Sequence, residues 1–234
     1  MLLNQYPWSQ AKSLERTKNT PPLKLRELGL QDYKPIWEAM RYLVENADDI
    51  RSDEIWLLSH KPVYTLGQAA GFEHVIDPRE IPVIKVDRGG QVTYHGPGQI
   101  VGYLLINVKR RQFGVREIVN LIESVLIDTL NEFGVLATTK KNAPGVYVND
   151  AKIASLGLRV RNGWCYHGLS LNVSMDTEPF LRINPCGFKG LRVAQVSDFV
   201  AKREGLLRQV QEVLSHKLLR AFGCLLYTSP SPRD

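Results

Sequence analysis

The sequence predicts an α+β domain in which helices pack on a mixed, mostly antiparallel sheet. Short apolar runs separated by turn residues outnumber the segments with a long helical repeat. The pair Asn162-Gly163, between two apolar runs, is the strongest short hairpin signal in the chain. Strands joined by hairpins, with few long helices, are typical of this fold class.

Length and composition fit one globular domain. The chain has 234 residues, of which 44% are hydrophobic and 23% charged. The net charge of +6 suits an acidic partner but is too small and dispersed to indicate nucleic-acid binding. The three cysteines show no CxxC pair and no metal-ligand spacing, which argues against a disulfide scaffold or a metal site. No apolar run reaches the roughly 18 residues of a membrane span. We expect a reduced, cytoplasmic protein with no nucleic-acid or membrane partner.

Composition divides the chain into three parts. Residues 1–22 have little periodicity, and we interpret them as a loose N-terminal extension. Residues 23–223 hold the periodic segments and are interpreted as a single domain. Residues 224–234, CLLYTSPSPRD, break off from a helical pattern and resemble the translation of a sequencing-library adapter. We interpret this last part as a non-native tail.

The first elements are one helix and three strands. Apolar residues at i, i+3 and i+4 spacing predict a helix over Gln31–Ala47. Glu54–Ser59 and Val63–Leu66 are short apolar runs and read as two strands around a turn. Ile81–Val86 is a further strand, and it leads the chain into a glycine-rich stretch.

That stretch, RGGQVTYHGPGQ at residues 88–99, holds four glycines and a proline between two strands. Glycine loses the most backbone freedom on ordering and proline lacks a donor, so the composition makes a poor helix and a poor strand interior. The alternative is an ordinary turn. Because polar side chains are interleaved with the glycines, we interpret the stretch as a ligand-binding loop.

A strand over Gly102–Val108 leaves the loop and runs directly into the basic residues Lys109–Arg111. These three residues form either a solvated loop or a docking patch for an acidic carrier protein. A helix over Arg116–Phe133 follows, with one apolar stripe and Gly134 as its stop. A second amphipathic helix is predicted over Glu204–Phe222.

The intervening segment is predicted as strands. Gly145–Val148 and Ala151–Val160 are joined at Asn149-Asp150, and Asn162-Gly163 joins the second of them to Trp164–Val173. With a two-residue turn at 162–163, opposed residues have numbers that sum to 325. Since side chains alternate along a strand, this register predicts which residues share one face. They are Lys152, Ala154, Leu156, Leu158, Val160, Cys165, His167, Leu169, Leu171 and Val173.

Lys152 is the one cation on that face, where a buried ammonium is costly. It is either buried there or reaches solvent from the end of its strand. Cys165 could pair with His167 as a nucleophile, or be a small buried apolar residue. Cys186 differs because it lies between a proline and a glycine in the aperiodic segment INPCGFKG. A loop thiol of this kind can be exposed, and a nearby ammonium would favour its thiolate.

Several motifs together resemble one enzyme family, the lipoyl(octanoyl) transferases, from about Leu25 to Phe199 without an evident gap. These enzymes move an octanoyl group from acyl carrier protein to a lysine of a lipoyl domain. The resemblance implies the catalytic fold shared by biotin protein ligases and lipoate ligases. The motifs are RGGQVTYHGPGQ at 88–99, APGVYV at 143–148, KIASLGLR at 152–159, HGLSLNV at 167–173 and INPCG at 183–187.

By this resemblance, Cys186 is the catalytic nucleophile that carries the acyl group as a thioester, and Lys152 activates its thiol and shuttles the proton. Small residues on paired strands would admit a flexible acyl chain beside the glycine-rich loop. The implied substrate-binding residues are Arg88, Gly89, Gly90, Gln91, Val92, Thr93, Tyr94, His95, Ser155, Leu156, Gly157, Gly168, Leu169 and Ser170.

The implied reaction uses octanoyl-acyl carrier protein as donor, with no ATP and no metal. The implied acceptors are lipoyl domains of 2-oxoacid dehydrogenase complexes and the glycine cleavage H protein. Three alternatives stay open: an ATP-dependent lipoate-protein ligase, a non-catalytic protein that binds carrier or lipoyl domains, and an esterase that uses Cys165 and His167. The intact NPCG segment speaks against the first, because an adenylate route needs no cysteine.

Overall fold

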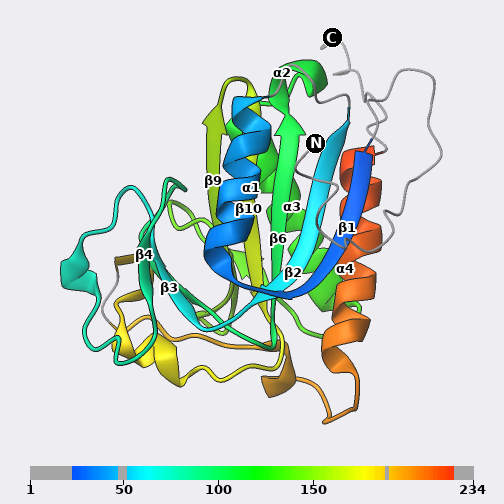
Figure 1. The fold of residues 1–234 in the computed structure, drawn as a ribbon. Coiled ribbons are helices and arrows are strands. Elements are labelled where there is room, and N and C mark those ends of the chain that lie inside the picture. The colour runs from blue at the N-terminus through cyan, green and yellow to red at the C-terminus, as the bar shows by residue number, and fades with distance from the viewer. Residues whose placement is uncertain (1–22, 47–51, 188–189, 224–234) are drawn as a thin grey trace.

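The computed structural model describes residues 23–46, 52–187 and 190–223 (Figure 1). The predicted extension 1–22 and the predicted tail 224–234 lie outside the described residues. Among the described helices, none is long and apolar enough to cross a membrane.

Two sheets form the framework (Figure 1). Among the named strands, only Leu23–Gln31 with Asp53–His60 and Val63–Leu66 with Val83–Lys85 pair in parallel, so the predicted mixed and mostly antiparallel sheet is confirmed. The larger sheet has seven strands in the order β1 (Leu23–Gln31), β2 (Asp53–His60), β6 (Gln99–Asn107), β10 (Trp164–Asn172), β9 (Ala151–Arg161), β8 (Val146–Val148) and β7 (Thr138–Thr139). The smaller sheet has the order β4 (Val83–Lys85), β3 (Val63–Leu66) and β5 (Val92–His95).

Helices cover both faces of the larger sheet, as Figure 1 shows. Neighbouring residues of β2 point to opposite faces, so Trp56 packs with the helix Tyr33–Glu45 while Ile55 packs with the helices Val115–Asn131 and Leu206–Gly223. The predicted helices are therefore confirmed, with ends that differ by a few residues. The α-helices are α1 (Tyr33–Glu45), α2 (Val108–Arg111), α3 (Val115–Asn131) and α4 (Leu206–Gly223), and the 3-10 turns are η3 (Phe72–His74), η4 (Glu178–Arg182), η5 (Pro185–Gly187) and η6 (Val196–Asp198).

The glycine-rich stretch is not a loop throughout, which corrects the prediction. Val92–His95 form β5 and pair with β3. The apolar and β-branched residues of this segment favour a strand, and the glycines flank it. Gly90 and Gly98 have φ angles of 84° and 86°, which glycine adopts readily, so the chain turns at both ends of β5. The predicted strands β2 and β3 also belong to different sheets, rather than lying side by side around their turn.

The β9–β10 hairpin has the predicted turn and register. Asn162 and Gly163 both have positive φ angles, 52° and 77°, as a two-residue hairpin turn of this kind requires. Opposed residues sum to 325 from Arg161 and Trp164 as far as Ala154 and Leu171.

The predicted register fails at the start of β9. Between Tyr147 and Val146 the partner on β9 changes from Lys152 to Ala154, so β9 bulges at this point. Ile153 was predicted on the opposite face. Because of the bulge, it joins Ala154 in the main core, the apolar cluster between the larger sheet and helices α3 and α4. Lys152 does not face Val173; it forms a parallel bridge with Val193 instead.

The basic run at 109–111 is not a loop, and because Lys109 and Arg110 are exposed, its role as a docking patch stays a prediction. It forms helix α2, and both Arg110 and Arg111 bind the carboxylate of Asp53. Arg111 also donates a hydrogen bond to the carbonyl of Phe222 at the end of α4, and its side chain is only 2% exposed. The two arginines therefore neutralise a fully buried carboxylate and tie α2 to β2 and α4.

We expect Asp53→Asn to lower the free energy of unfolding by about 3–5 kcal/mol, because it leaves buried arginine charge without its counter-ion. Urea denaturation followed by circular dichroism measures the change. Glu38→Gln is the matched control, since Glu38 pairs with Lys34 on the exposed surface of α1. It should change stability by less than about 0.5 kcal/mol. Equal effects of the two variants would contradict the structural role of Asp53.

Candidate active site

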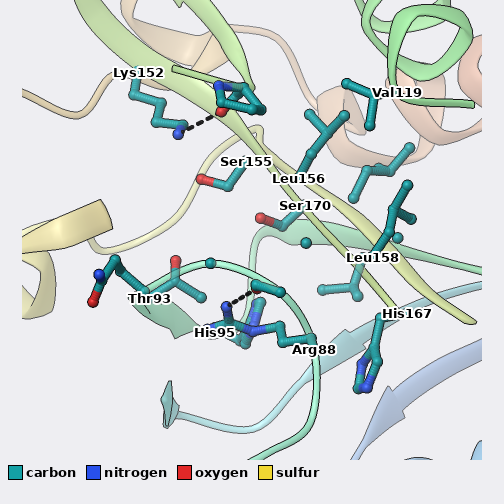
Figure 2. Close-up of a pocket in the computed structure, with 18 of the residues that line it drawn as sticks. Arg88, Thr93, His95, Val119, Lys152, Ser155, Leu156, Leu158, His167 and Ser170 are labelled. Atoms are coloured by element: carbon teal, nitrogen blue, oxygen red, sulfur yellow. Dashed lines mark hydrogen bonds between the residues drawn. The ribbon is translucent and has the colours of Figure 1, made fainter. Parts of the chain in front are cut away.

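A cavity of about 370 Å³ lies between the glycine-rich stretch and the β9–β10 hairpin. Figure 2 shows the labelled side chains of Ser155, Leu156 and Ser170 in the middle of this cavity. The ends of the cavity differ from its middle, because Lys152 lies at one end and His167 at the other (Figure 2). Apolar lining residues of the middle include Val119 from α3 and Leu156, Leu158 and Leu169 from the hairpin.

The glycine-rich stretch is clamped from its outer side. Backbone N–H groups of residues 67–69 donate to the carbonyls of Gln91, Arg88 and Gly90, at distances of 2.9–3.3 Å. On the inner side, the Gly89 N–H donates to the Leu158 carbonyl at 2.9 Å. Because β8 pairs with β9 only as far as Ala154, this contact lies on an edge of β9 that β8 leaves open. The clamp therefore fixes one wall of the cavity against the open edge of β9.

Glycine is needed at several points of this wall because backbones approach closely. A Cβ added to Gly67 would lie 2.2 Å from the Gly90 carbonyl oxygen, and one on Gly157 would lie 3.1 Å from the Gly89 carbonyl oxygen. Both contacts are shorter than ordinary Cβ contacts. The wall thus depends on glycines from three separate segments of the chain.

Arg88 is buried in this wall and is held by Thr65. Its guanidinium donates to the Thr65 hydroxyl at 2.8 and 3.2 Å, to the Thr65 carbonyl at 2.7 Å and to the Gly89 carbonyl at 3.0 Å. These bonds orient a permanent positive charge beside the cavity. Arg88 thereby anchors the first residue of the glycine-rich stretch.

His95 is a structural anchor of the same wall. Its Nδ1 lies 2.7 Å from the Gln99 side-chain oxygen, which can only accept, so Nδ1 carries the proton. The Gln99 amide in turn donates to Asn172 at 2.9 Å. Burial lowers the pKa of His95 to about 3, so the ring is neutral at physiological pH.

Lys152 is buried, which settles the choice between burial and solvent exposure. The residue is 5% exposed, and its Nζ donates to the Pro144 carbonyl at 2.9 Å. The ammonium also lies 5.4 Å from the centroid of the Tyr147 ring, a cation–π contact. A Cβ on Gly145 would lie 2.5 Å from Lys152 Cε, so only glycine leaves room for this side chain.

The backbone of Cys186 lies in η5, whereas the placement of its side chain is outside what the structure describes. The η5 turn packs against β5. A Cβ added to Gly187 would lie 3.3 Å from the side chain of Gln91, which lines the cavity. The turn that carries Cys186 is therefore adjacent to the cavity wall.

Cys165 has no catalytic partner in His167. Cys165 is fully buried in the main core, and burial raises the pKa of its thiol to about 12. The Nε2 atom of His167 instead lies 3.0 Å from Asp87. The esterase alternative needs a Cys165 thiolate next to His167, so this geometry argues against it.

The family model "Lipoyl protein ligase A/B catalytic domain" matches residues 32–219, most of the chain. The chain belongs to this family. Two relatives named octanoyltransferase are 57% identical over 178 residues, from Hahella chejuensis, and 53% identical over 213 residues, from Xanthomonas campestris pv. campestris. The alignments cover 76% of this chain and 80% of the first relative, and 91% of both chains for the second. The predicted lipoyl(octanoyl) transferase family and the predicted enzyme class, an acyltransferase, are confirmed.

Solved structures confirm the predicted fold of this lipoyl protein ligase A/B family member. A lipoate-protein ligase A bound with ATP aligns with a TM-score of 0.67 at 15% identity, covering 86% of this chain and 85% of the other. A bi-partite lipoate protein ligase from Thermoplasma acidophilum aligns with a TM-score of 0.63 at 15% identity, covering 84% and 82%. At this identity the likeness concerns the fold alone.

In this family member, the residues predicted to bind substrate line the cavity, with the exception of Tyr94. Alternation along β5 turns the Tyr94 ring away from the cavity. It packs in the core of the smaller sheet, 5.5 Å from the Tyr64 ring and 5.4 Å from the Phe180 ring. The structure thus brings together the glycine-rich stretch, the hairpin positions and Lys152.

The polar end of the cavity was not predicted from the sequence. Tyr33 and Tyr103 line it together with His167, and Asp87 lies directly behind His167. Tyr103 offers no distinct signal, since it is one aromatic residue in an apolar strand. The DRGG sequence could have drawn attention to Asp87, because an acidic residue directly precedes the glycine-rich stretch. Within the described ranges, no group of three or more His, Cys, Asp or Glu side chains is arranged to hold a metal ion.

Proposed function

We propose that this protein transfers an octanoyl group from octanoyl-acyl carrier protein to a lysine of a lipoyl domain, through a thioester on Cys186. The observation that carries the proposal is the apolar cavity with Lys152 at one end and the Cys186 turn against its wall. The relatives named octanoyltransferase support the octanoyl group as the cargo for lipoylation.

The cavity has the chemistry that an unbranched acyl chain requires. Its middle is lined by the apolar side chains of Leu156, Leu158 and Val119, which remove the methylene groups of such a chain from water. Glycines at 89 and 157 allow the close approach of the glycine-rich stretch to β9 that forms this wall of the cavity. The carbonyl end of the chain would then lie toward Lys152 and η5.

In the first step, the Cys186 thiolate attacks the carbonyl carbon of the donor thioester. The bond from that carbon to the donor sulfur breaks, and Lys152 supplies the proton that the departing thiol takes up. In the second step, the acceptor lysine amine attacks the acyl-Cys186 carbonyl and Lys152 accepts a proton. The bond to Cys186 breaks, an amide forms, and the free cysteine is restored.

This route needs neither ATP nor a metal ion. Exchange of one thioester for another is nearly isoenergetic, and conversion of a thioester into an amide runs downhill. The proposed acceptors are lipoyl domains of 2-oxoacid dehydrogenase complexes and the glycine cleavage H protein. An acidic carrier protein suits the net charge of +6, and the proposed location is the cytoplasm.

Intact mass spectrometry of a lipoyl domain tests this function. Incubation with the protein and octanoyl-acyl carrier protein, without ATP, should add one octanoyl mass to the lipoyl domain. A parallel incubation supplies octanoic acid and ATP in place of the acylated carrier protein. Product in the second incubation alone would overturn the proposal in favour of an ATP-dependent ligase. Product in neither would favour a binding protein without catalysis.

Gly67→Ala should lower kcat/KM for this transfer by about 10²-fold, because an added methyl group pushes the Gly90 carbonyl, and with it the cavity wall, out of place. Gly71→Ala is the matched control. The atoms nearest to its added methyl group belong to the exposed, flexible side chain of Glu73, which can move aside. Steady-state kinetics give kcat/KM for both variants. An unchanged kcat/KM in Gly67→Ala would contradict the role of the hydrogen bonds that clamp the glycine-rich stretch.

A further inference from the structure

His167 has a backbone conformation that is unusual for its place in a strand. Neighbouring strand residues normally point to opposite faces, yet the side chains of Tyr166 and His167 both hydrogen-bond to Asp87. This is possible because His167 has a φ angle of 60°, in the left-handed region that disfavours residues other than glycine. Strain of this kind persists where the surroundings enforce it, and it is concentrated at functional sites.

The burial of the His167 ring costs free energy in addition to the backbone strain. It is 1% exposed, and its Nδ1 atom has no hydrogen-bond partner among the described residues. Burial lowers the pKa of His167 below its ordinary value, against the raising effect of Asp87, so the ring tends to be neutral. A buried polar atom without a partner is destabilising. An apolar residue would pack here without these costs. A purely structural role therefore does not explain the strained backbone and the unpartnered nitrogen of His167, which indicates a functional role.

His167 lies at the end of the cavity that is farthest from Lys152. His167 pairs with Leu158 across the hairpin, and Leu158 is six residues along β9 from Lys152, roughly 20 Å at the rise of a strand. Figure 2 shows Lys152 and His167 at opposite ends of the labelled residues, with Leu156 and Leu158 between them. A chain whose carbonyl lies near Lys152 would therefore point its terminal methyl group at His167.

The end wall is rigid because the ring is held on several sides. Tyr166 stacks on it at 5.0 Å, and Tyr103 lies edge-on at 6.1 Å. Behind it, Asp87 also accepts a hydrogen bond from Trp37 at 2.8 Å. Burial alone would raise the pKa of Asp87, but the hydrogen bonds from His167, Tyr166 and Trp37 lower it below its ordinary value, so Asp87 stays charged and holds all three groups. The ring cannot move aside for a longer chain without breaking these contacts.

We infer that His167 sets the length of acyl chain that the cavity accepts, acting as a rigid stop for the terminal methyl group. This inference rests on the proposed function for the direction of the chain. A chain that reaches the ring cannot extend past it unless His167 leaves its contacts with Asp87, Tyr166 and Tyr103. His167 is thus a specificity-determining residue for the length of an unbranched acyl chain.

The first test locates the methyl group in the unaltered protein. Octanoic acid labelled with ¹³C at its terminal methyl group is bound, and nuclear Overhauser contacts from that methyl group are recorded. Contacts with the His167 ring protons are expected. Contacts with the Lys152 or Tyr147 side chains instead, or no saturable binding, would overturn the inference. Because this measurement involves no acyl transfer, it is read independently of whether the transfer reaction occurs.

The second test removes the stop. His167→Gly deletes the ring and suits the left-handed backbone, and His167→Asn is the matched control that tolerates this backbone and keeps a polar group near Asp87. Calorimetry compares decanoic with octanoic acid. The ratio of dissociation constants, decanoic over octanoic, should fall at least tenfold in His167→Gly and much less in His167→Asn. An unchanged ratio in folded His167→Gly, or an equal fall in both variants, would overturn the inference. If His167→Gly does not fold, the methyl contacts decide.

Discussion

Cys186→Ser is expected to abolish octanoyl transfer, with a loss of about 10⁴-fold or more in kcat, the scale seen when an enzyme loses its nucleophile. A serine hydroxyl is a far weaker nucleophile than a thiolate unless a base activates it. Intact mass spectrometry after incubation with octanoyl-acyl carrier protein gives the most direct readout. The wild-type protein should gain one octanoyl mass that the lipoyl domain then removes, and the variant should gain none.

Cys165→Ala is the matched control for this result. Cys165 is fully buried in the main core, and burial holds the pKa of its thiol at about 12. Its removal should lower stability through the cavity it leaves, while acylation and transfer persist. If Cys165→Ala loses acylation and Cys186→Ser retains it, the assignment of the nucleophile is wrong.

Lys152→Met should lower kcat for acyl transfer by about 10²–10⁴-fold, the usual contribution of a positioned acid or base. Methionine approximates the shape of lysine but cannot donate to the Pro144 carbonyl or move a proton. The variant removes a buried ammonium, so the free energy of unfolding is measured alongside, to separate a folding defect from a loss of chemistry. Pre-steady-state acylation of Cys186 and release to the lipoyl domain should both slow.

Lys140→Met is the control for Lys152→Met. Lys140 also contacts the Tyr147 ring, at 4.7 Å, but it pairs with the exposed Asp150 and does not line the cavity. This variant should retain acylation and should change only contacts at the surface. Equal losses of kcat in both variants would indicate that the contacts around Tyr147 support acyl transfer, and would contradict proton transfer by Lys152.

Local patterns in the sequence predicted the elements well. The helical repeats before and after residue 110 correspond to α1, α3 and α4, because an apolar stripe of this period buries only as a helix. Asn162-Gly163 predicted the hairpin register because both residues accept positive φ angles. The start of β9 could not be predicted in the same way, since a bulge has no signature of its own in the alternation of side chains.

Most of the residues that line the candidate site were predicted from motifs, but which of the motif side chains face the cavity was not. The glycine-rich stretch and the hairpin positions were predicted to meet substrate, and they meet around one cavity. Tyr94 was included because it lies within the motif, whereas its side chain belongs to the core of the smaller sheet. A motif gives the order of residues, and the pleat of the strand decides which of them face the cavity.

By itself, the sequence determined the fold class, the hairpin and the family, because these depend on backbone preferences, periodicity and the order of motifs along the chain. Only the tertiary structure decided that Arg111 neutralises Asp53 and that His167 closes the cavity against Asp87. The residues of these pairs lie 58 and 80 positions apart. Such contacts depend on which strands become neighbours in the sheets, and that arrangement leaves no local trace around either residue.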